Sequence, residues 1–147
     1  MQWKKKLFDV LTVQELYAIL KARVDVFVVE QNCPYGEIDN YDQVSTHLYL
    51  ENDGEIIAYA RLLPRNVKYK EASIGRVLVN QTYRKNGYAK ELLERSIAVI
   101  LEEWKEPAIK IQGQEYLRQF YGSFGFKEIS DIYLEDDIPH VDMLLRT

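Results

Sequence analysis

The sequence is poor in cysteine and histidine. It contains one cysteine, Cys33, and two histidines among 147 residues. A lone cysteine excludes an intramolecular disulfide and is typical of a protein in a reducing compartment. We therefore expect a cytoplasmic protein whose fold needs no covalent cross-link.

Long apolar runs and an excess of positive charge are also missing. No apolar stretch approaches the roughly 20 residues that span a membrane. The basic start, residues 1–6, is not followed by a sustained apolar segment, so no signal peptide is expected. The net charge of -4 argues against nucleic acid as the main partner. We expect neither a membrane nor a nucleic acid to be a partner.

What is present is an ordinary globular composition, with 47% hydrophobic and 29% charged residues. The length suits one domain over residues 1–147, which can bury about two-thirds of its unfolded surface. Acidic residues gather in two segments, 30–42 and 131–137. These segments are either solvated loops or a rim that attracts a cationic substrate such as an amine.

Strand and helix patterns alternate along the chain and predict one α/β domain. Thr12 and Glu15 have the spacing of a capping box, which predicts a helix from residue 13 to about 29. Asn52-Asp53-Gly54 predicts a hairpin between strands 47–51 and 55–63. The remaining predicted elements are strand 74–79, a helix through Trp104, strand 108–112, a helix over about 115–124, and strands 129–134 and 141–145 joined around Pro139.

One junction between a strand and a helix has the form of a phosphate-binding turn. Strand 74–79 leads through Arg84-Lys85-Asn86-Gly87-Tyr88-Ala89 into the following helix. The first backbone N–H groups of a helix lack partners and the helix dipole is positive there, so anions bind at this end. Gly87 lets an anion approach the backbone closely. Taken alone, the same pattern also describes a basic turn that caps an ordinary helix.

A second segment, Phe120-Tyr121-Gly122-Ser123-Phe124-Gly125-Phe126, follows one strand and one helix later. Together the two segments resemble the GNAT superfamily of acyl-CoA-dependent N-acyltransferases, with its Arg/Gln-x-x-Gly-x-Gly/Ala and Phe-Tyr-x-x-x-Gly-Phe motifs. The first third resembles the ElaA-like branch. The matching segments there are Arg23 to Tyr35, Glu37-x-Asp39-x-x-Asp42 and Tyr59-Ala60-Arg61, with Ile138-Pro139-His140 near the end. The resemblance implies an α/β (α+β) fold with a central mixed, mostly antiparallel sheet flanked by helices.

The resemblance also implies a reaction and a cofactor site. An acetyl group would pass directly from acetyl-CoA to the primary amine of a small molecule or peptide, without a metal. Tyr121 matches the tyrosine that protonates the leaving thiolate, although it could instead be a core aromatic. Gln114 stands near the usual place of an asparagine and would contact pantetheine. Many members of this fold dimerise through late strands, which makes a homodimer an expectation. The cofactor residues implied are Val77 and Val79 for pantetheine and Arg84, Lys85, Asn86, Gly87, Tyr88 and Ala89 for the pyrophosphate.

The acceptor side is less determined by the sequence. Imidazole titrates near neutral pH, so His140 is a candidate general base. Glu30 or Glu37 could accept the proton instead, and deprotonation in bulk water is a further alternative. We expect the acceptor to contact Arg23, Glu30, Glu37 and Arg61. The two arginines could equally pair with acidic loop residues and anchor the loop.

Two other functions fit parts of the sequence. A non-catalytic acyl-CoA-binding sensor would keep the same fold. The Arg23-x-x-x-Phe27 pattern and the acidic motif after it resemble those of autoinducer (acyl-homoserine lactone) synthases. However, they carry a tryptophan between these elements, and the only tryptophans here are Trp3 and Trp104.

Overall fold

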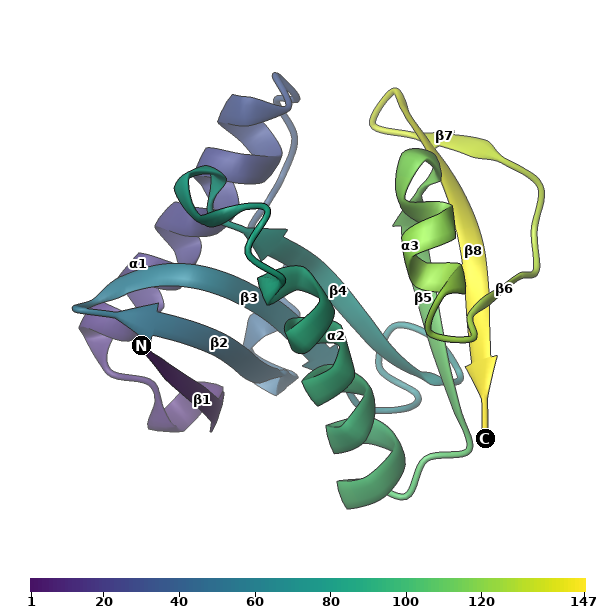
Figure 1. Ribbon diagram of the computed structural model, residues 1–147, viewed down its shortest axis with the longest axis horizontal. Helices are drawn as coiled ribbons and strands as arrows, with labels where there is room; N and C mark the ends of the chain where they lie inside the picture. Colours follow the sequence, from purple (N-terminus) through teal and green to yellow (C-terminus); the bar gives the residue numbers. More distant parts are fainter.

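A single eight-stranded sheet runs through the molecule (Figure 1). The computed structural model describes residues 1–147, and the sheet order is β1-β2-β3-β4-β5-β8-β6, with β7 paired to β8. Only β4 and β5 are parallel, so the mixed, mostly antiparallel sheet is confirmed. The strands are β1 (Gln2–Leu7), β2 (Thr46–Asn52), β3 (Glu55–Leu63), β4 (Ala72–Val79), β5 (Ala108–Gln114), β6 (Lys127–Glu128), β7 (Tyr133–Glu135) and β8 (Ile138–Arg146).

Helices cover both faces of the sheet. Successive side chains of a strand point to opposite faces. Ala58 and Ala60 of β3 therefore join a core with Leu93 of α2, while Tyr59 joins a second core with Ile19 of α1. None of the helices combines the length and apolar character needed to cross a membrane. The helices are α1 (Val13–Val24), extended by a π-helical segment η2 (Asp25–Glu30), α2 (Tyr88–Ala98), extended by η5 (Val99–Glu103), and α3 (Arg118–Gly122), with 3-10 turns η1 (Phe8–Val10), η3 (Asp42–Val44), η4 (Gln81–Tyr83) and η6 (Glu115–Leu117).

The sheet opens between β4 and β5. These strands pair only at Ala72 with Ile109 and at Ser73 with Lys110, and then diverge (Figure 1). A bulge in β4 accompanies the divergence: between its pairs with β3, one β3 residue faces two β4 residues. Arg76 lies in the bulge with φ +49°. The β4 backbone beyond the bulge therefore has no strand partner on its β5 side.

The C-terminal hairpin differs from the sequence prediction. We expected strands 129–134 and 141–145 to meet around Pro139, which is wrong. The turn lies at Asp136 and Asp137, both with positive φ, and Pro139 lies inside β8. Strand β5 ends opposite His140, so Pro139 has no partner on the β5 side that could use its missing N–H. His140 consequently belongs to a strand and not to a loop.

The predicted capping box forms at the start of α1. Thr12 Oγ1 accepts a hydrogen bond from the Glu15 N–H at 3.0 Å, and Glu15 Oε1 accepts one from the Thr12 N–H at 2.9 Å. Tyr49 also donates to Glu15 at 2.7 Å. Burial alone would raise the pKa of Glu15, but these hydrogen bonds and those from Lys6 hold it below its usual range.

Replacing Thr12 by Ala should lower the free energy of unfolding by about 1 kcal/mol, because one helix N–H loses its acceptor. Urea denaturation would measure the change. Thr82→Ala is the matched control, because the Thr82 side chain is exposed and it should stay within about 0.5 kcal/mol of wild type. Equal stability of the Thr12 variant and the control would contradict the role of the box.

Candidate active site

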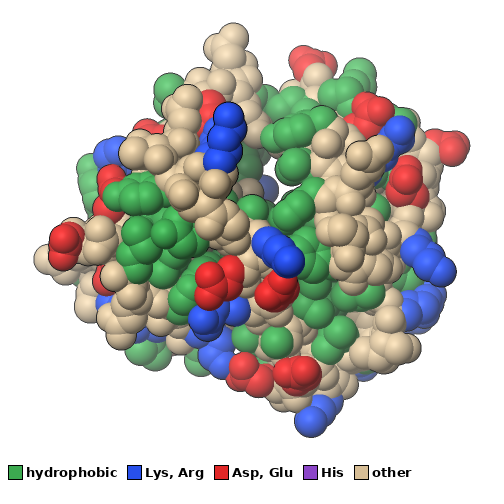
Figure 2. All heavy atoms as spheres, in the orientation of Figure 1, with side chains coloured by type: hydrophobic (Ala, Val, Ile, Leu, Met, Phe, Trp, Pro, Cys, Tyr) green, Lys and Arg blue, Asp and Glu red, His purple; other side chains and the backbone are tan.

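The divergence of β4 and β5 opens into a cavity of about 950 Å³. A hollow is visible between the two halves of the molecule in Figure 2. Its walls come from η2 and the loop after it, from β3 and β4, from the turn before α2, and from β5, α3 and the β7–β8 hairpin. The volume lies at the upper end of the range for ligand sites in proteins.

The turn before α2 forms one end of the cavity. Gly87 caps the helix with φ +81°, and a Cβ built there would meet no atom within 4 Å. The first helical hydrogen bond runs from Glu91 N–H to Gly87 O at 3.2 Å. The N–H groups of residues 88–90 therefore have no helical acceptor and are available to an anion. The cavity is lined here by Arg84, Lys85, Gly87, Tyr88, Ala89 and Lys90.

Asn86, which we expected at the pyrophosphate, does not line the cavity. Its amide donates to the carbonyl oxygens of Tyr83 at 3.0 Å and Arg84 at 3.3 Å. These bonds hold the turn closed, so the structure gives this side chain a supporting role.

Arg84 is already engaged by an acidic partner. Its guanidinium makes a bidentate pair with Glu30 at 2.6 and 2.9 Å, and its Nε donates to Val79 O at 3.0 Å. The Glu30 carboxylate therefore lies beside the turn before α2. Glu30 also lines the cavity, so its contact with the acceptor stays a prediction, although Arg84 already pairs with both of its oxygens.

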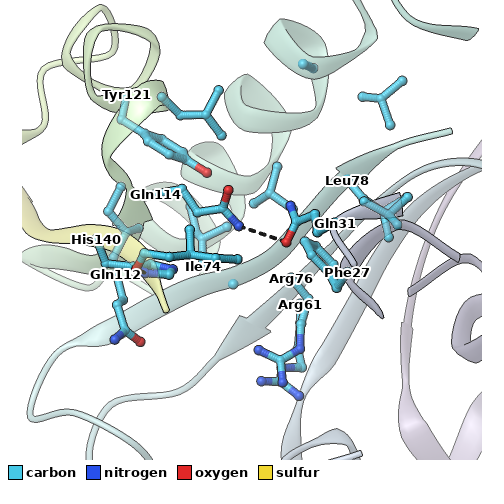
Figure 3. Close-up of a pocket in the computed structure, with 18 of the residues that line it drawn as sticks. Phe27, Gln31, Arg61, Ile74, Arg76, Leu78, Gln112, Gln114, Tyr121 and His140 are labelled. Atoms are coloured by element: carbon cyan, nitrogen blue, oxygen red, sulfur yellow. Dashed lines mark hydrogen bonds between the residues drawn. The ribbon is translucent and has the colours of Figure 1, made fainter. Parts of the chain in front are cut away.

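The middle of the cavity follows the open edge of β4. Val77 and Val79 both line it, beyond the point where β4 leaves β5. At the facing end of β5, Gln114 donates from Nε2 to Gln31 Oε1 at 3.3 Å. This hydrogen bond joins the two walls across the cavity (Figure 3).

Tyr121 points its hydroxyl into the cavity from α3 (Figure 3). Its ring is 7% exposed and packs edge-on against Phe120 and Phe126. A Cβ at Gly113 would approach the ring to 3.2 Å, so glycine leaves the space that Tyr121 fills. Burial raises the pKa of Tyr121, so the hydroxyl keeps its proton and can act as a donor.

His140 reaches the cavity from β8, opposite Gln114 of β5. Its Nδ1 lies 2.7 Å from Ile138 O. A carbonyl oxygen can only accept, so Nδ1 carries the hydrogen, and in the neutral ring the lone pair is on Nε2. The ring also stacks on Tyr133. In Figure 3, Tyr121, Gln114 and His140 lie on one side of the cavity and Phe27 and Gln31 on the other.

Arg23 and Glu37 are not placed to contact a substrate. Arg23 is 0% exposed and donates to Glu37 at 2.7 Å and Asp42 at 2.6 Å. Arg61 makes a bidentate pair with Asp39, both contacts at 2.8 Å, and reaches Asp42 at 3.1 Å. Neither Arg23 nor Glu37 lines the cavity, so the alternative expectation, in which Arg23 and Arg61 pair with acidic loop residues and anchor the loop, fits the structure better than substrate binding by Arg23 and Glu37. Arg61 and Asp39 do line the cavity.

Arg76 completes this network and was missed in the sequence. From the β4 bulge it donates to Glu37 at 2.6 Å and to Asp39 at 3.2 Å. Three arginines thus face three carboxylates, which ties the 32–46 loop to β3 and β4. A lone arginine in a predicted strand gave no signal, although the Glu37-x-Asp39-x-x-Asp42 spacing marks its partners.

A split sheet, a helix N-terminus at one end of the split and a buried tyrosine at the other match the acyl-CoA-dependent transferases expected from the resemblance. The acetyltransferase (GNAT) domain family matches residues 14–147. A UPF0039 protein of Schizosaccharomyces pombe is 44% identical over 143 residues, covering 96% of this chain and 94% of the relative. The chain belongs to the GNAT acetyltransferase family, whose members transfer acyl groups.

Solved structures agree with this assignment. An acyl-CoA N-acyltransferase from Pseudomonas aeruginosa superposes with a TM-score of 0.93 at 39% identity, covering 98% of both chains. Escherichia coli ElaA superposes with a TM-score of 0.92 at 34% identity, covering 99% of this chain and 100% of ElaA. The similarity to the ElaA-like branch is confirmed.

Replacing Asp39 by Asn should lower the free energy of unfolding at pH 7. It should also reduce the further loss of stability as the pH falls. Burial alone would raise the pKa of Asp39, but Arg61, with smaller contributions from the Tyr41 N–H and Arg76, lowers it from 3.8 to about 2. The ionised carboxylate therefore adds about 2 kcal/mol of stability above pH 4, which is lost as the pH falls toward 2. Urea denaturation at pH 7, 4 and 2.5 would measure both effects.

Asp25→Asn is the matched control, because Asp25 pairs with Lys21 on the exposed surface of α1. Solvent screens an exposed pair, which contributes little to stability, so this variant should keep the acid response of wild type. An unchanged acid response in the Asp39 variant would contradict the network.

Proposed function

We propose that the protein is a single-domain cytoplasmic N-acetyltransferase that moves an acetyl group from acetyl-CoA to the primary amine of a small molecule or peptide. Family membership supports acyl transfer, and one structural observation supports the specific form. A continuous cavity joins the free N–H groups of α2 to Tyr121 and to the free Nε2 of His140. We further expect a homodimer through the late strands, where Ile132 and Leu134 are exposed apolar residues.

Coenzyme A would lie along the open edge of β4. Its pyrophosphate would accept hydrogen bonds from the N–H groups of residues 88–90, and Lys85 would add positive charge. Its pantetheine amides would pair with the β4 backbone near Val77 and Val79, which has no partner on that side. Arg84 would keep Glu30 neutralised, because a free carboxylate there would repel the phosphates.

The acetyl group would pass directly from sulfur to nitrogen through a tetrahedral intermediate at the thioester carbon. The amine nitrogen attacks the carbonyl, the new C–N bond forms and the C–S bond breaks. His140 Nε2 accepts the amine proton, and the Tyr121 hydroxyl gives its proton to the departing sulfur. Unpaired N–H groups of β4 would stabilise the oxyanion while it exists. No metal takes part in this route.

Binding of the cofactor is tested by Gly87→Glu. Saturating acetyl-CoA should raise the melting temperature of wild type, because a ligand at 100 times its Kd adds about 2.7 kcal/mol. The added carboxylate should abolish this shift by repelling the pyrophosphate. Gly87→Asn is the matched control, since asparagine tolerates positive φ and carries no charge, and it should retain part of the shift. If acetyl-CoA raised the melting temperature of the Glu variant as much as that of wild type, the turn before α2 would not be the phosphate site.

The chemistry is tested by Tyr121→Phe and His140→Asn in a thiol-release assay with acetyl-CoA and a panel of amines. Each variant should lose roughly 100-fold or more in turnover while keeping the acetyl-CoA thermal shift. Tyr116→Phe is the matched control, because this exposed tyrosine also lines the cavity and should retain turnover within about twofold. Wild-type turnover in the Tyr121 variant would exclude it as the acid. Cofactor binding without thiol release from any amine would favour the sensor alternative.

A further inference from the structure

The acceptor side of the cavity, which we define as the part lined by β5 and the β3–β4 loop, has polar side chains along β5. On β5, Ile109 and Ile111 point into the core shared with α2, so Gln112 and Gln114 point to the opposite face. On β4, a Cβ built at Gly75 would meet no atom within 4 Å, which leaves open space above that strand. A row of amide side chains beside open space favours a polar acceptor over an apolar one.

The arginines on the acceptor side of the cavity are already neutralised by carboxylates of the protein. Arg61 and Arg76 each contact carboxylates of the 32–46 loop at 3.2 Å or less. Asp39 bridges the two, so their charges are matched within the protein. The one donor nitrogen of Arg61 without a hydrogen-bond partner, its Nε, is buried and presents no surface to an anion in the cavity.

Lys68 is different. It lines the cavity from the β3–β4 loop, and no carboxylate oxygen lies within 4 Å of its Nζ. The Nζ lies 5.8 Å from the ring centre of Tyr41 and 5.5 Å from that of Tyr69. Partial desolvation lowers the pKa of Lys68, and the charges of Arg76 and Arg61 lower it further. The carboxylates of Asp39 and Glu135 raise the pKa of Lys68, but burial and the two arginines outweigh them, so a bound anion would stabilise the charged ammonium.

We propose that Lys68, Tyr41 and Tyr69 form a subsite for an anionic group on the acceptor. The acceptor would then be an amine that also carries a carboxylate or a similar anion. This inference rests on the proposed function, because it assigns the substrate class of the same site.

The geometry separates the anion from the reacting amine. Tyr69 donates its hydroxyl to Gln112 Oε1 at 3.4 Å, whereas His140 is opposite Gln114, two residues further along β5. Two residues of a strand span about 7 Å. An acceptor that reaches both points would hold its carboxylate several bonds from its amine, as in an ω-amino acid or in the ε-amine of free lysine.

The test uses matched pairs of acceptors that differ only in the carboxylate. Straight-chain ω-amino acids of three to six carbons are compared with the alkylamines of equal length, by thiol release from acetyl-CoA. At low salt, wild type should show the lower KM for the acid in at least one pair. Lys68→Met should raise that KM about fivefold and leave the alkylamine unchanged, as expected for one ion pair near the surface. Added salt should reduce the difference in KM between the acid and the alkylamine for wild type.

Lys70→Met is the matched control, because Lys70 is an exposed lysine of the same loop that does not line the cavity. It should behave as wild type with both acceptors. Equal use of acid and amine by wild type, or an equal effect of Lys68→Met on both, would overturn the subsite while leaving the transferase function standing.

Product binding gives a second readout that does not need turnover. With CoA present, N-acetylated ω-amino acids should raise the melting temperature more than N-acetylated alkylamines, and Lys68→Met should remove that difference. Absence of a difference that depends on Lys68 would overturn the subsite. Failure of every amine to release thiol would count against the proposed function instead.

Discussion

The parallel pairing of β4 with β5 ends after Ser73 and Lys110, and the site depends on that ending. A strand that stayed paired would use its N–H and C=O groups on its neighbour and would fill the cavity with backbone. The bulge at Arg76 turns β4 away, and its φ of +49° is unfavourable for a residue with a side chain. The hydrogen bonds from Arg76 to Glu37 and Asp39 stabilise this bulge.

The same network explains why the 32–46 loop can be irregular and still be fixed. Removing one partner of a buried ion pair leaves the other desolvated, which costs about 3–5 kcal/mol. Here each carboxylate contacts two arginines, so no single contact carries the loop. The loop contributes Asp39 and Tyr41 to the cavity wall, and the network thereby sets the shape of the acceptor side.

Local patterns made much of this structure predictable from sequence. The Asn52-Asp53-Gly54 turn, the capping box and the Gly87 turn each depend on residues close together in the chain, and all three form. Two ion pairs of the site have non-local causes. Hydrophobic periodicity treats an arginine as exposed, yet Arg23 is buried because carboxylates 14 and 19 residues away neutralise it. Likewise, the Glu30–Arg84 pair joins positions 54 residues apart, which no local spacing reveals.

The choice of general base shows how these non-local contacts narrow the chemistry. The sequence offered His140 as the candidate base, with Glu30, Glu37 and bulk water as alternatives. Glu37 is buried between two arginines, and Glu30 pairs with a third. Protonation of either carboxylate by the amine would therefore weaken an ion pair. His140 meets no such obstacle, because the Ile138 carbonyl holds its Nδ1 hydrogen and leaves Nε2 free. Among the protein's own candidates, only the imidazole can accept the proton without first breaking a bond that supports the site.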